Sequence, residues 1–328
     1  MPRGILIFFL SFILGFQVLS QNAQNPKFQA AISLYSNGDF ENAKTQFLDI
    51  LKTQKSPSKE LYFYLGKTHH ATHDFHKAIQ FYKSFLRKLS PKEPRRALVK
   101  SEILRCSVGL KIMENENTQR INIQKSDSTL FKFIPLNQAN ETQFVNDSVL
   151  VYSSSDEGGN GGYDLFYKIK KLGIWSPPIN FGHPINSMWD ERFPHVSPDG
   201  QTLYFSSNNC RNSLGGYDIL STQFNPKGKL WTFPKNMAFP INSAADEIYF
   251  RVLIDTLANG YFILSRKEFG KWNPYVFQVD STQIKSPFPD DFQKFWELDL
   301  NKSNAQKELE NPTNFDKTKG LSYDVIIF

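Results

Sequence analysis

Two hydrophobic periodicities divide the chain into a helical part and a strand-rich part. Between residues 26 and 113, apolar positions recur at spacings of three and four, which is typical of amphipathic helices. Between residues 129 and 280 the spacing shortens to two, and Phe and Tyr occupy many apolar positions, as in β-strands. The pattern therefore predicts an α+β multidomain protein, with helices first and an all-β domain second. The polar stretch at residues 114–128 is the predicted linker between them.

The clearest strand pattern lies at residues 193–220. A turn is predicted at Ser197, Pro198, Asp199 and Gly200, because Pro presets φ at about −65° and Gly accepts a positive φ. After the turn, Leu203 and Phe205 alternate with Thr202, Tyr204 and Ser206, which predicts a strand with one buried face. The double glycine that follows breaks the pattern, and an extended run then resumes. The stretch therefore predicts a unit of strand, turn, strand, loop and strand.

The chain contains this unit more than once. The motif Gly161, Gly162, Tyr163 and Asp164 returns 54 residues later as Gly215, Gly216, Tyr217 and Asp218. Each motif is followed by a Trp, the sequence Pro-Ile-Asn-Ser and an Asp-Glu pair, and a weaker third copy runs from Tyr261 to Trp272. Because a repeat of this kind cannot bury its own sheet face, the copies are predicted to stack on one another.

The motif SPDGQTLYFSSN followed by GGYDI resembles the WD40-like PD40 repeat of TolB-type β-propellers. The form with GGYDL, Trp and PINS resembles the periplasmic tetratricopeptide/PD40 proteins of Bacteroidota, such as the PorE-like components linked to type IX secretion and gliding. The resemblance implies a propeller-like sheet domain. Propellers close with about four to eight blades, whereas residues 129–280 hold three copies, so we expect an incomplete propeller or self-association. Several members of this family continue into an OmpA-like peptidoglycan-binding domain, which is not recognised in this sequence.

The helical part also repeats. Gly38, Asp39 and Phe40 return 35 residues later as His73, Asp74 and Phe75, and each triplet is followed by a small residue, Ala43 or Ala78. A small residue lets the second helix of a pair approach the first closely, and the period resembles the tetratricopeptide repeat of about 34 residues. Residues 94–113 predict a further helix, with apolar positions at Ala97, Ile103, Leu104, Val108 and Leu110.

Arrays of helical repeats present a concave face that holds peptides or partner helices. Aromatic side chains tend to anchor interfaces, so the candidate partner-binding residues on this face are Tyr35, Tyr62, His69 and Tyr82. The predicted partners are other cell-envelope proteins, bound by the helical repeats and by the sheets. No cofactor is expected.

Residues 1–20 predict an export signal. Arg3 precedes the apolar run Ile5–Leu14, and the small Ser20 ends the segment. A bilayer-spanning helix needs about 20 apolar residues, so we expect a cleaved signal, with an uncleaved anchor as the alternative, and no span in the mature chain. The protein is therefore predicted to be exported and, from the resemblance, periplasmic and associated with the outer membrane. Residues 281–328 form a tail that ends in a strand-like run.

Charge and cysteine content argue against a nucleic-acid-binding protein and against a disulfide-linked one. The formal charge of +6 comes from 38 basic and 32 acidic residues without a long basic run, so nucleic acid is not an expected partner. Cys106 and Cys210 fall in different predicted domains, and we interpret them as two unrelated thiols rather than a disulfide.

Three patterns suggest chemistry. Four histidines, His69, His70, His73 and His76, could hold a metal, but the repeat register favours an exposed, partly packed cluster. The Asp/Gly-rich loop at residues 156–164 could hold calcium; alternatively, Asp164 and Asp218 bond backbone amides. The Asp-Glu pairs at residues 190–191 and 246–247 recur in both copies, which favours a structural role over acid/base catalysis.

No nucleophile elbow, phosphate loop or dinucleotide fingerprint is found in the sequence. The sequence therefore predicts a non-enzymatic envelope scaffold that mediates protein–protein interactions, in an assembly related to type IX secretion or gliding. The alternative is a sensor that binds a glycan or calcium through its Asp/Gly loops.

Overall fold

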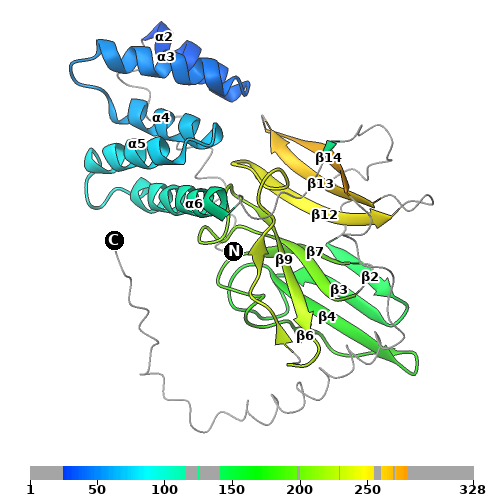
Figure 1. The fold of residues 1–328 in the computed structure, drawn as a ribbon. Coiled ribbons are helices and arrows are strands. Elements are labelled where there is room, and N and C mark those ends of the chain that lie inside the picture. The colour runs from blue at the N-terminus through cyan, green and yellow to red at the C-terminus, as the bar shows by residue number, and fades with distance from the viewer. Residues whose placement is uncertain are drawn as a thin grey trace.

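The computed structural model describes residues 25–115, 124–125, 141–197, 200–228, 230–254, 260–268 and 270–279. Within them the chain is α+β, with five helices followed by antiparallel β-sheets, as the periodicities predict. Figure 1 shows the helices on one side of the sheets. The predicted export signal, the tail, Pro198, Asp199 and most of the predicted linker lie outside the described residues. None of the described helices is long and apolar enough to cross a membrane.

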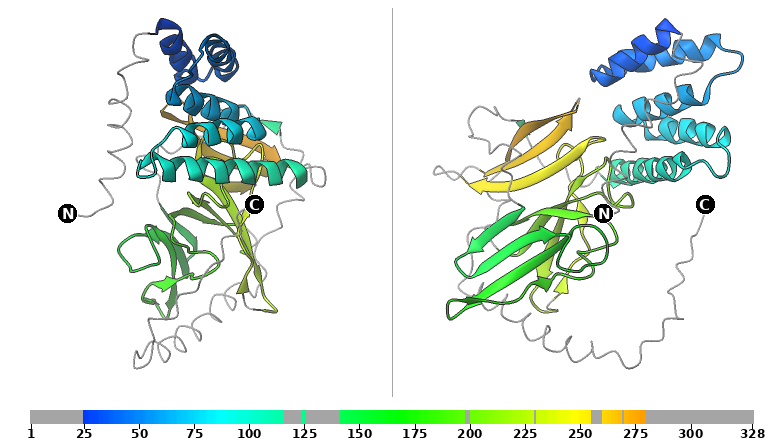
Figure 2. Two further views of the ribbon diagram at one scale, coloured as in Figure 1. Left: turned by 90° about the vertical axis from the view of Figure 1, so that its left-hand side faces the viewer. Right: turned by 180° about the vertical axis from the view of Figure 1, so that it is seen from behind.

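The helices form two consecutive pairs and a longer final helix. They are α2 (Pro26–Ser36), α3 (Phe40–Thr53), α4 (Lys59–Ala71), α5 (Phe75–Arg87) and α6 (Arg95–Asn115). Asp39 accepts a hydrogen bond from the Asn42 amide and begins α3, while Asp74 accepts one from the Lys77 amide and begins α5. The two repeated triplets are therefore the turns and N-caps of the pairs. Figure 2 shows the helices stacked in chain order, with α6 nearest the sheets.

Small residues set the spacing between the helices. Ala43 and Ala78 are both fully buried, as their repeat positions predict. A Cβ added to Gly66 of α4 would lie 2.5 Å from Cδ1 of Tyr82 on α5, so only glycine fits against this ring. The predicted apolar set of α6 is wrong at Ala97 and Leu104, which are exposed, and it omits Val99 and Cys106, which are buried.

The strands form three antiparallel sheets. Sheet I contains β2 (Thr142–Asn146), β3 (Val149–Ser154), β4 (Asp164–Lys171), β5 (Ile174–Trp175) and β6 (Ile179–Asn180). Sheet II contains β7 (Glu191–Val196), β8 (Thr202–Ser207), β9 (Asp218–Asn225), β10 (Leu230–Trp231) and β11 (Lys235–Asn236). Sheet III contains β12 (Asp246–Ile254), β13 (Gly260–Glu268), β14 (Lys271–Val279) and β1 (Gln124–Lys125). Each copy of the sequence unit thus corresponds to one sheet, including the weak third copy.

Sheet II is packed between the other two sheets. Leu203 and Phe205 of β8 belong to the core shared with sheet I, whereas Tyr204 packs into the core shared with sheet III. The expectation of a strand with one buried face is therefore wrong for β8, because the stack covers both faces of its sheet. The turn before β8 is confirmed where it is described: the Gly200 amide bonds the Ser197 carbonyl at 2.9 Å, and Gly200 has φ +68°.

The described strands form an open stack of three sheets and no closed propeller. Edge strands of the three sheets are joined by side chains that cross between sheets. Gln143 of β2 accepts from the Val196 amide of β7 at 2.6 Å, and His195 of β7 accepts from the Val252 amide of β12 at 3.0 Å. Burial holds the pKa of His195 well below its usual value, which keeps this ring neutral as an acceptor.

Loops of sheets II and III dock on the helices. Nε2 of His70 lies 2.8 Å from the Leu214 carbonyl oxygen and can only donate to it, and the Leu214 side chain is buried in the core of α5 and α6. The centres of the Phe239 and His73 rings lie 4.4 Å apart. These contacts fix the helical array against the sheet stack and position the space between them.

Candidate functional site

The carboxylates that recur in the glycine-rich loops bond the loops' own backbone amides. Asp218 accepts from the amides of Leu214 and Gly215, both at 2.8 Å, and Asp164 accepts from the Asn160 amide at 2.6 Å. This is the structural alternative that the sequence leaves open. Among the described residues, no group of three or more His, Cys, Asp or Glu side chains could hold a metal ion.

The two Asp-Glu pairs make the same bonds in both copies. Asp190 accepts from the Tyr163 amide at 3.0 Å, and Asp246 accepts from the Tyr217 amide at 3.1 Å. The acids therefore hold the end of each glycine-rich loop against the next sheet. A contact that recurs in this way supports a structural role for both pairs.

Glu191 is buried at the start of β7. Its carboxylate accepts from the amide and hydroxyl of Ser187, at 2.9 and 2.6 Å, and from the Ser207 hydroxyl at 3.2 Å. Burial raises the pKa of Glu191 to about 7, and these hydrogen bonds act in the opposite direction. Its repeat equivalent, Glu247, makes matching bonds to Ser243 and an ion pair with Arg266, and burial raises its pKa too.

The Asn side chain of each Pro-Ile-Asn-Ser motif bonds both the amide and the carbonyl of one strand residue, as the backbone of a neighbouring strand would. Asn242 accepts from the Ile219 amide at 2.7 Å and donates to the Ile219 carbonyl at 2.8 Å. Asn186 makes the same pair of bonds to Leu165, at 2.9 and 2.8 Å. The motifs that dominate the sheet sequence are therefore explained by the fold, and none of them provides an open site.

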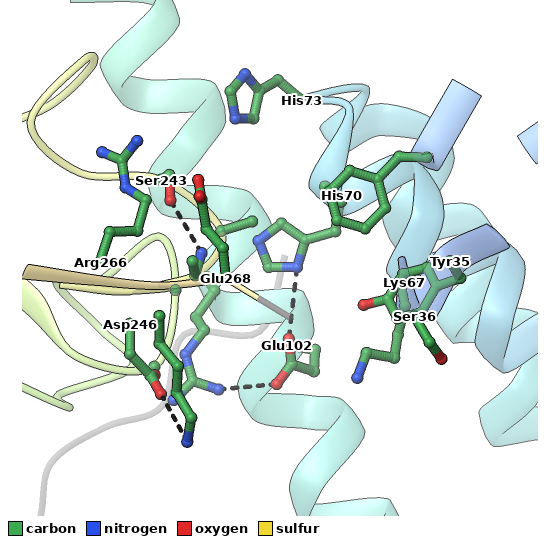
Figure 3. Close-up of a pocket in the computed structure, with 18 of the residues that line it drawn as sticks. Tyr35, Ser36, Lys67, His70, His73, Glu102, Ser243, Asp246, Arg266 and Glu268 are labelled. Atoms are coloured by element: carbon green, nitrogen blue, oxygen red, sulfur yellow. Dashed lines mark hydrogen bonds and ion pairs between the residues drawn. The ribbon is translucent and has the colours of Figure 1, made fainter. Parts of the chain in front are cut away.

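A cavity lies between the helices and the loops of sheets II and III. Its volume is about 570 Å³. Tyr35, Lys67 and Glu102 lie on its helical wall, and Asp246 and Arg266 lie on its sheet wall. Figure 3 shows the two groups facing each other across this space, with Glu102 between them. We call this space the interdomain cleft.

The helical wall of the cleft is charged and well organised. Glu102 of α6 lies 3.4 Å from Nδ1 of His70 and 2.9 Å from Arg105. Although burial opposes ionisation, the hydrogen bond with His70 and the charges of Arg105 and Lys67 lower the pKa of Glu102 to about 2. Nε2 of the same ring donates to the Leu214 carbonyl, so His70 links the wall of the cleft to the sheets.

Lys67 is the cation of this wall that is not paired with a carboxylate in the described structure. Its Nζ lies 5.5 Å from the ring centre of Tyr35 and 5.7 Å from that of Phe63. Interaction with Tyr35 raises the pKa of Lys67, burial lowers it, and the charge of Glu102 raises it further. Lys67 therefore carries a positive charge beside an aromatic surface that faces the cleft.

The sheet wall is also polar, but its groups are engaged. Asp246 faces Lys267 at 3.9 Å, and Arg266 donates to Glu247 at 2.6 Å. Glu268 accepts from the Tyr275 hydroxyl at 2.5 Å. Acids on both walls are thus held by donors of this chain. Lys67, which is hydrogen-bonded to Tyr35, is the cation of the helical wall without a carboxylate partner among the described residues.

The predicted partner-binding residues separate into three groups. Tyr35 lies in the interdomain cleft, as a residue of a binding face would. Tyr62 lies away from the cleft, partly buried, with Nζ of Lys88 5.7 Å from its ring centre. His69 and Tyr82 are buried inside the helical array, although Tyr82 also lines the cleft, and a role of either residue in partner binding stays a prediction.

The histidine cluster is not the exposed group that the repeat register suggested. His69 is buried and its Nδ1 lies 3.2 Å from Asp74, while His70 is buried at the docking interface; only His76 is exposed. Both cysteines are free and buried, Cys106 in α6 and Cys210 in the loop before the second double glycine. Burial raises the pKa of the Cys106 thiol, which keeps it protonated and unreactive.

Sequence reasoning missed Lys67, Glu102 and Arg105. These charges lie on helix faces that look exposed in an isolated helix, and they become a wall only when the sheets are docked opposite them. The sequence gives one signal of this docking, Leu214, which is an apolar residue inside a loop of turn-forming residues.

No protein-family model matches the chain, and a search of curated proteins gives no significant match.

Proposed function

We propose that this protein is a non-enzymatic scaffold that holds a polypeptide segment of a partner in the interdomain cleft. The observation that carries the proposal is that the cleft is built jointly by the helical array and the sheet stack. A groove formed by two docked modules, with an aromatic and a cationic side chain directed into it, suits an extended segment that must be gripped from both sides.

The composition of the walls supports a polypeptide rather than a small apolar ligand. Charged and histidine side chains make up about half of the lining, whereas sites for small molecules are mostly apolar with a few polar groups. Protein–protein interfaces have polar, solvent-accessible rims and bridging water molecules, so a charged wall is compatible with a polypeptide partner. Tyr35 is the residue expected to contribute most, because Tyr anchors combine apolar area with a hydrogen-bonding hydroxyl.

The ionisation of the walls supports binding rather than catalysis. A general acid or base works best when its pKa lies near the working pH. Glu102 has its pKa lowered to about 2, and the neighbouring Arg105 and His70 hold it in the charged form. Glu102 therefore serves as a fixed element of the wall, which orients Arg105 and His70.

We further propose that the helices are tetratricopeptide-type repeats and the sheets are PD40-type blades. The supports are the repeated capped turns, the Gly66 contact with Tyr82, and the bonds repeated between sheets I and II. The setting that we propose is the cell envelope of Bacteroidota, in an assembly related to type IX secretion or gliding. It rests on the sequence resemblance and on the signal-like residues 1–20.

The experiment is site-specific photo-crosslinking in the native host. A photoreactive amino acid replaces Ser36, an exposed residue of the cleft, or Lys52, an exposed residue of α3 outside it. We expect a defined adduct from position 36 and none from position 52. The crosslinked segment is then made as a peptide, and its affinity for the purified protein is measured by calorimetry.

In that assay Tyr35→Ala and Lys67→Ala should each weaken the peptide by tenfold or more, since anchor residues contribute about 2 kcal/mol or more. Lys52→Ala is the matched control and should bind as the wild type does. Equal adducts from both positions, or a peptide whose affinity is insensitive to Tyr35 and Lys67, would refute the proposal.

A further inference from the structure

Two β-hairpins project aliphatic side chains into solvent, and the first is closed by a two-residue turn. Lys171 pairs with Ile174, so that Leu172 and Gly173 alone connect β4 to β5. Leu172 is fully exposed and Ile174 is 75% exposed. Lys170 and Trp175 form the next pair, with Nζ of the lysine 5.6 Å from the centre of the indole ring. The tip is therefore apolar, and a basic and an aromatic side chain flank it.

Folding does not explain the leucine at this tip. Leu172 has φ +49° and Gly173 has φ +82°, the conformation of a turn that strongly favours Asn-Gly or Asp-Gly. A leucine at positive φ is strained, and this one gains no packing because its side chain is fully exposed. An unfavourable residue at an exposed tip points to contact with something outside the chain.

The second hairpin repeats this chemistry. Leu230 of β10, the repeat equivalent of Ile174, is 60% exposed, and Phe233 just after it is 70% exposed. Trp231 follows Leu230 as Trp175 follows Ile174, and the exposed Lys227 lies in the turn before them. The described structure thus has two tips, each with exposed apolar side chains and a lysine, and each with a partly buried tryptophan beside them.

Both tips project from the same side of the sheet stack. The strands β4 and β9 begin at equivalent glycine-rich loops, and sheets I and II share one core, so their far ends lie on the same side of the stack. At about 3.3 Å per residue, the eight residues of β9 place its far end roughly 23 Å from the loop that contacts the helices. Figure 1 shows these strand ends directed away from the helical array.

We propose that the tips of the β4–β5 and β9–β10 hairpins dock on an anionic lipid surface. Exposed aliphatic side chains that protrude on a convex tip enter the boundary between headgroups and acyl chains without needing a shaped groove. Tryptophan is favoured at the headgroup level, and lysines near the surface are attracted to anionic lipid. The helical array then faces away from the membrane, with the interdomain cleft open to a partner.

The experiment measures co-sedimentation of the protein with vesicles of phosphatidylcholine alone or with 30% phosphatidylglycerol. Residues 1–20 are themselves apolar, so chains that begin after them are isolated from an exporting host and checked by mass spectrometry. We expect binding to the anionic vesicles that weakens as salt is raised, and much weaker binding to the neutral vesicles. Brominated lipids should quench tryptophan fluorescence in the bound state.

The decisive variant is Leu172→Asn, because Asn-Gly is the favoured sequence for this turn. It should keep or raise the melting temperature while lowering vesicle binding at least tenfold when combined with Ile174→Thr. The matched control is Leu98→Ser with Leu104→Ser, a pair of exposed leucines on α6, which should bind vesicles as the wild type does.

Three results would overturn the proposal. They are absence of binding by the wild-type protein at low salt, equal binding to neutral and anionic vesicles, and tip variants that bind like the wild type. Crosslinking of the tips to an acidic protein, with no vesicle binding, would assign them to a protein partner instead. Since the tips lie outside the cleft, none of these results depends on the proposed polypeptide binding.

Discussion

Replacement of Glu191 by Gln is expected to change how the stability of the protein depends on pH. Glu191 is buried at the edge of sheet II, and burial raises its pKa to about 7 from an ordinary 4.5. A carboxyl group with a raised pKa contributes stability in its protonated form. That contribution is complete below pH 4.5 and is lost as the pH rises through 7.

The size of the effect follows from the two pKa values. Between pH 5 and pH 8, linkage predicts that ionisation of Glu191 lowers the free energy of unfolding by about 2.5 kcal/mol. Gln has nearly the same shape and retains an acceptor for Ser187, but it does not ionise. Glu191→Gln should therefore be closest to the wild type at pH 5 and relatively more stable at pH 8.

Urea unfolding of both proteins at several pH values, followed by circular dichroism, measures this difference. The wild-type profile minus the Glu191→Gln profile removes the contributions of all other titrating groups. Glu114→Gln, an exposed residue of α6, is the control and should give a profile parallel to that of the wild type. Parallel profiles for Glu191→Gln, within about 0.5 kcal/mol, would show that the Ser187 and Ser207 bonds keep this carboxylate ionised and would refute the reasoning.

Two further substitutions test the internal contacts of each module. Gly66→Val should lower the free energy of unfolding by about 1–3 kcal/mol, because its Cβ would lie 2.5 Å from the Tyr82 ring. The control is Gly228→Ala, whose Cβ would meet nothing closer than 3.6 Å. Equal urea midpoints for the two variants would contradict this packing. Asn242→Ala leaves the Ile219 amide without its acceptor, while the Ile219 carbonyl still accepts from the Met237 amide, and should cost about 2 kcal/mol. Thermal unfolding unchanged from the wild type would show that water replaces the lost bond of the amide.

Local sequence accounted for most of the secondary structure. Asp39 and Asp74 begin helices because a short carboxylate reaches amides only two or three residues ahead, and such contacts depend little on the rest of the fold. The same holds for Asp218, which bonds amides three and four residues before it. The number of sheets could be predicted from the sequence for a related reason, since each copy of the motif folds into one antiparallel unit.

Burial was less predictable from the sequence. Tyr82 and His69 look like surface aromatics on a helical face, yet the close approach of α4 and α5 and the packing of α6 bury the first, and Phe81 and Asp74 enclose the second. Strand β8 shows the same limit, because the sequence pattern of a strand cannot reveal a second sheet that packs on its polar-looking face.

The sequence by itself determined the order of helices and strands, the capped turns and the repeated bonds within each unit, because these depend on residues close together in the chain. Only the tertiary structure decided the interdomain cleft. The contact between His70 and Leu214 joins residues 144 positions apart, and it brings the charges of α4 and α6 opposite those of sheet III. Pairings at such separation depend on the packing of whole modules, which no local pattern records.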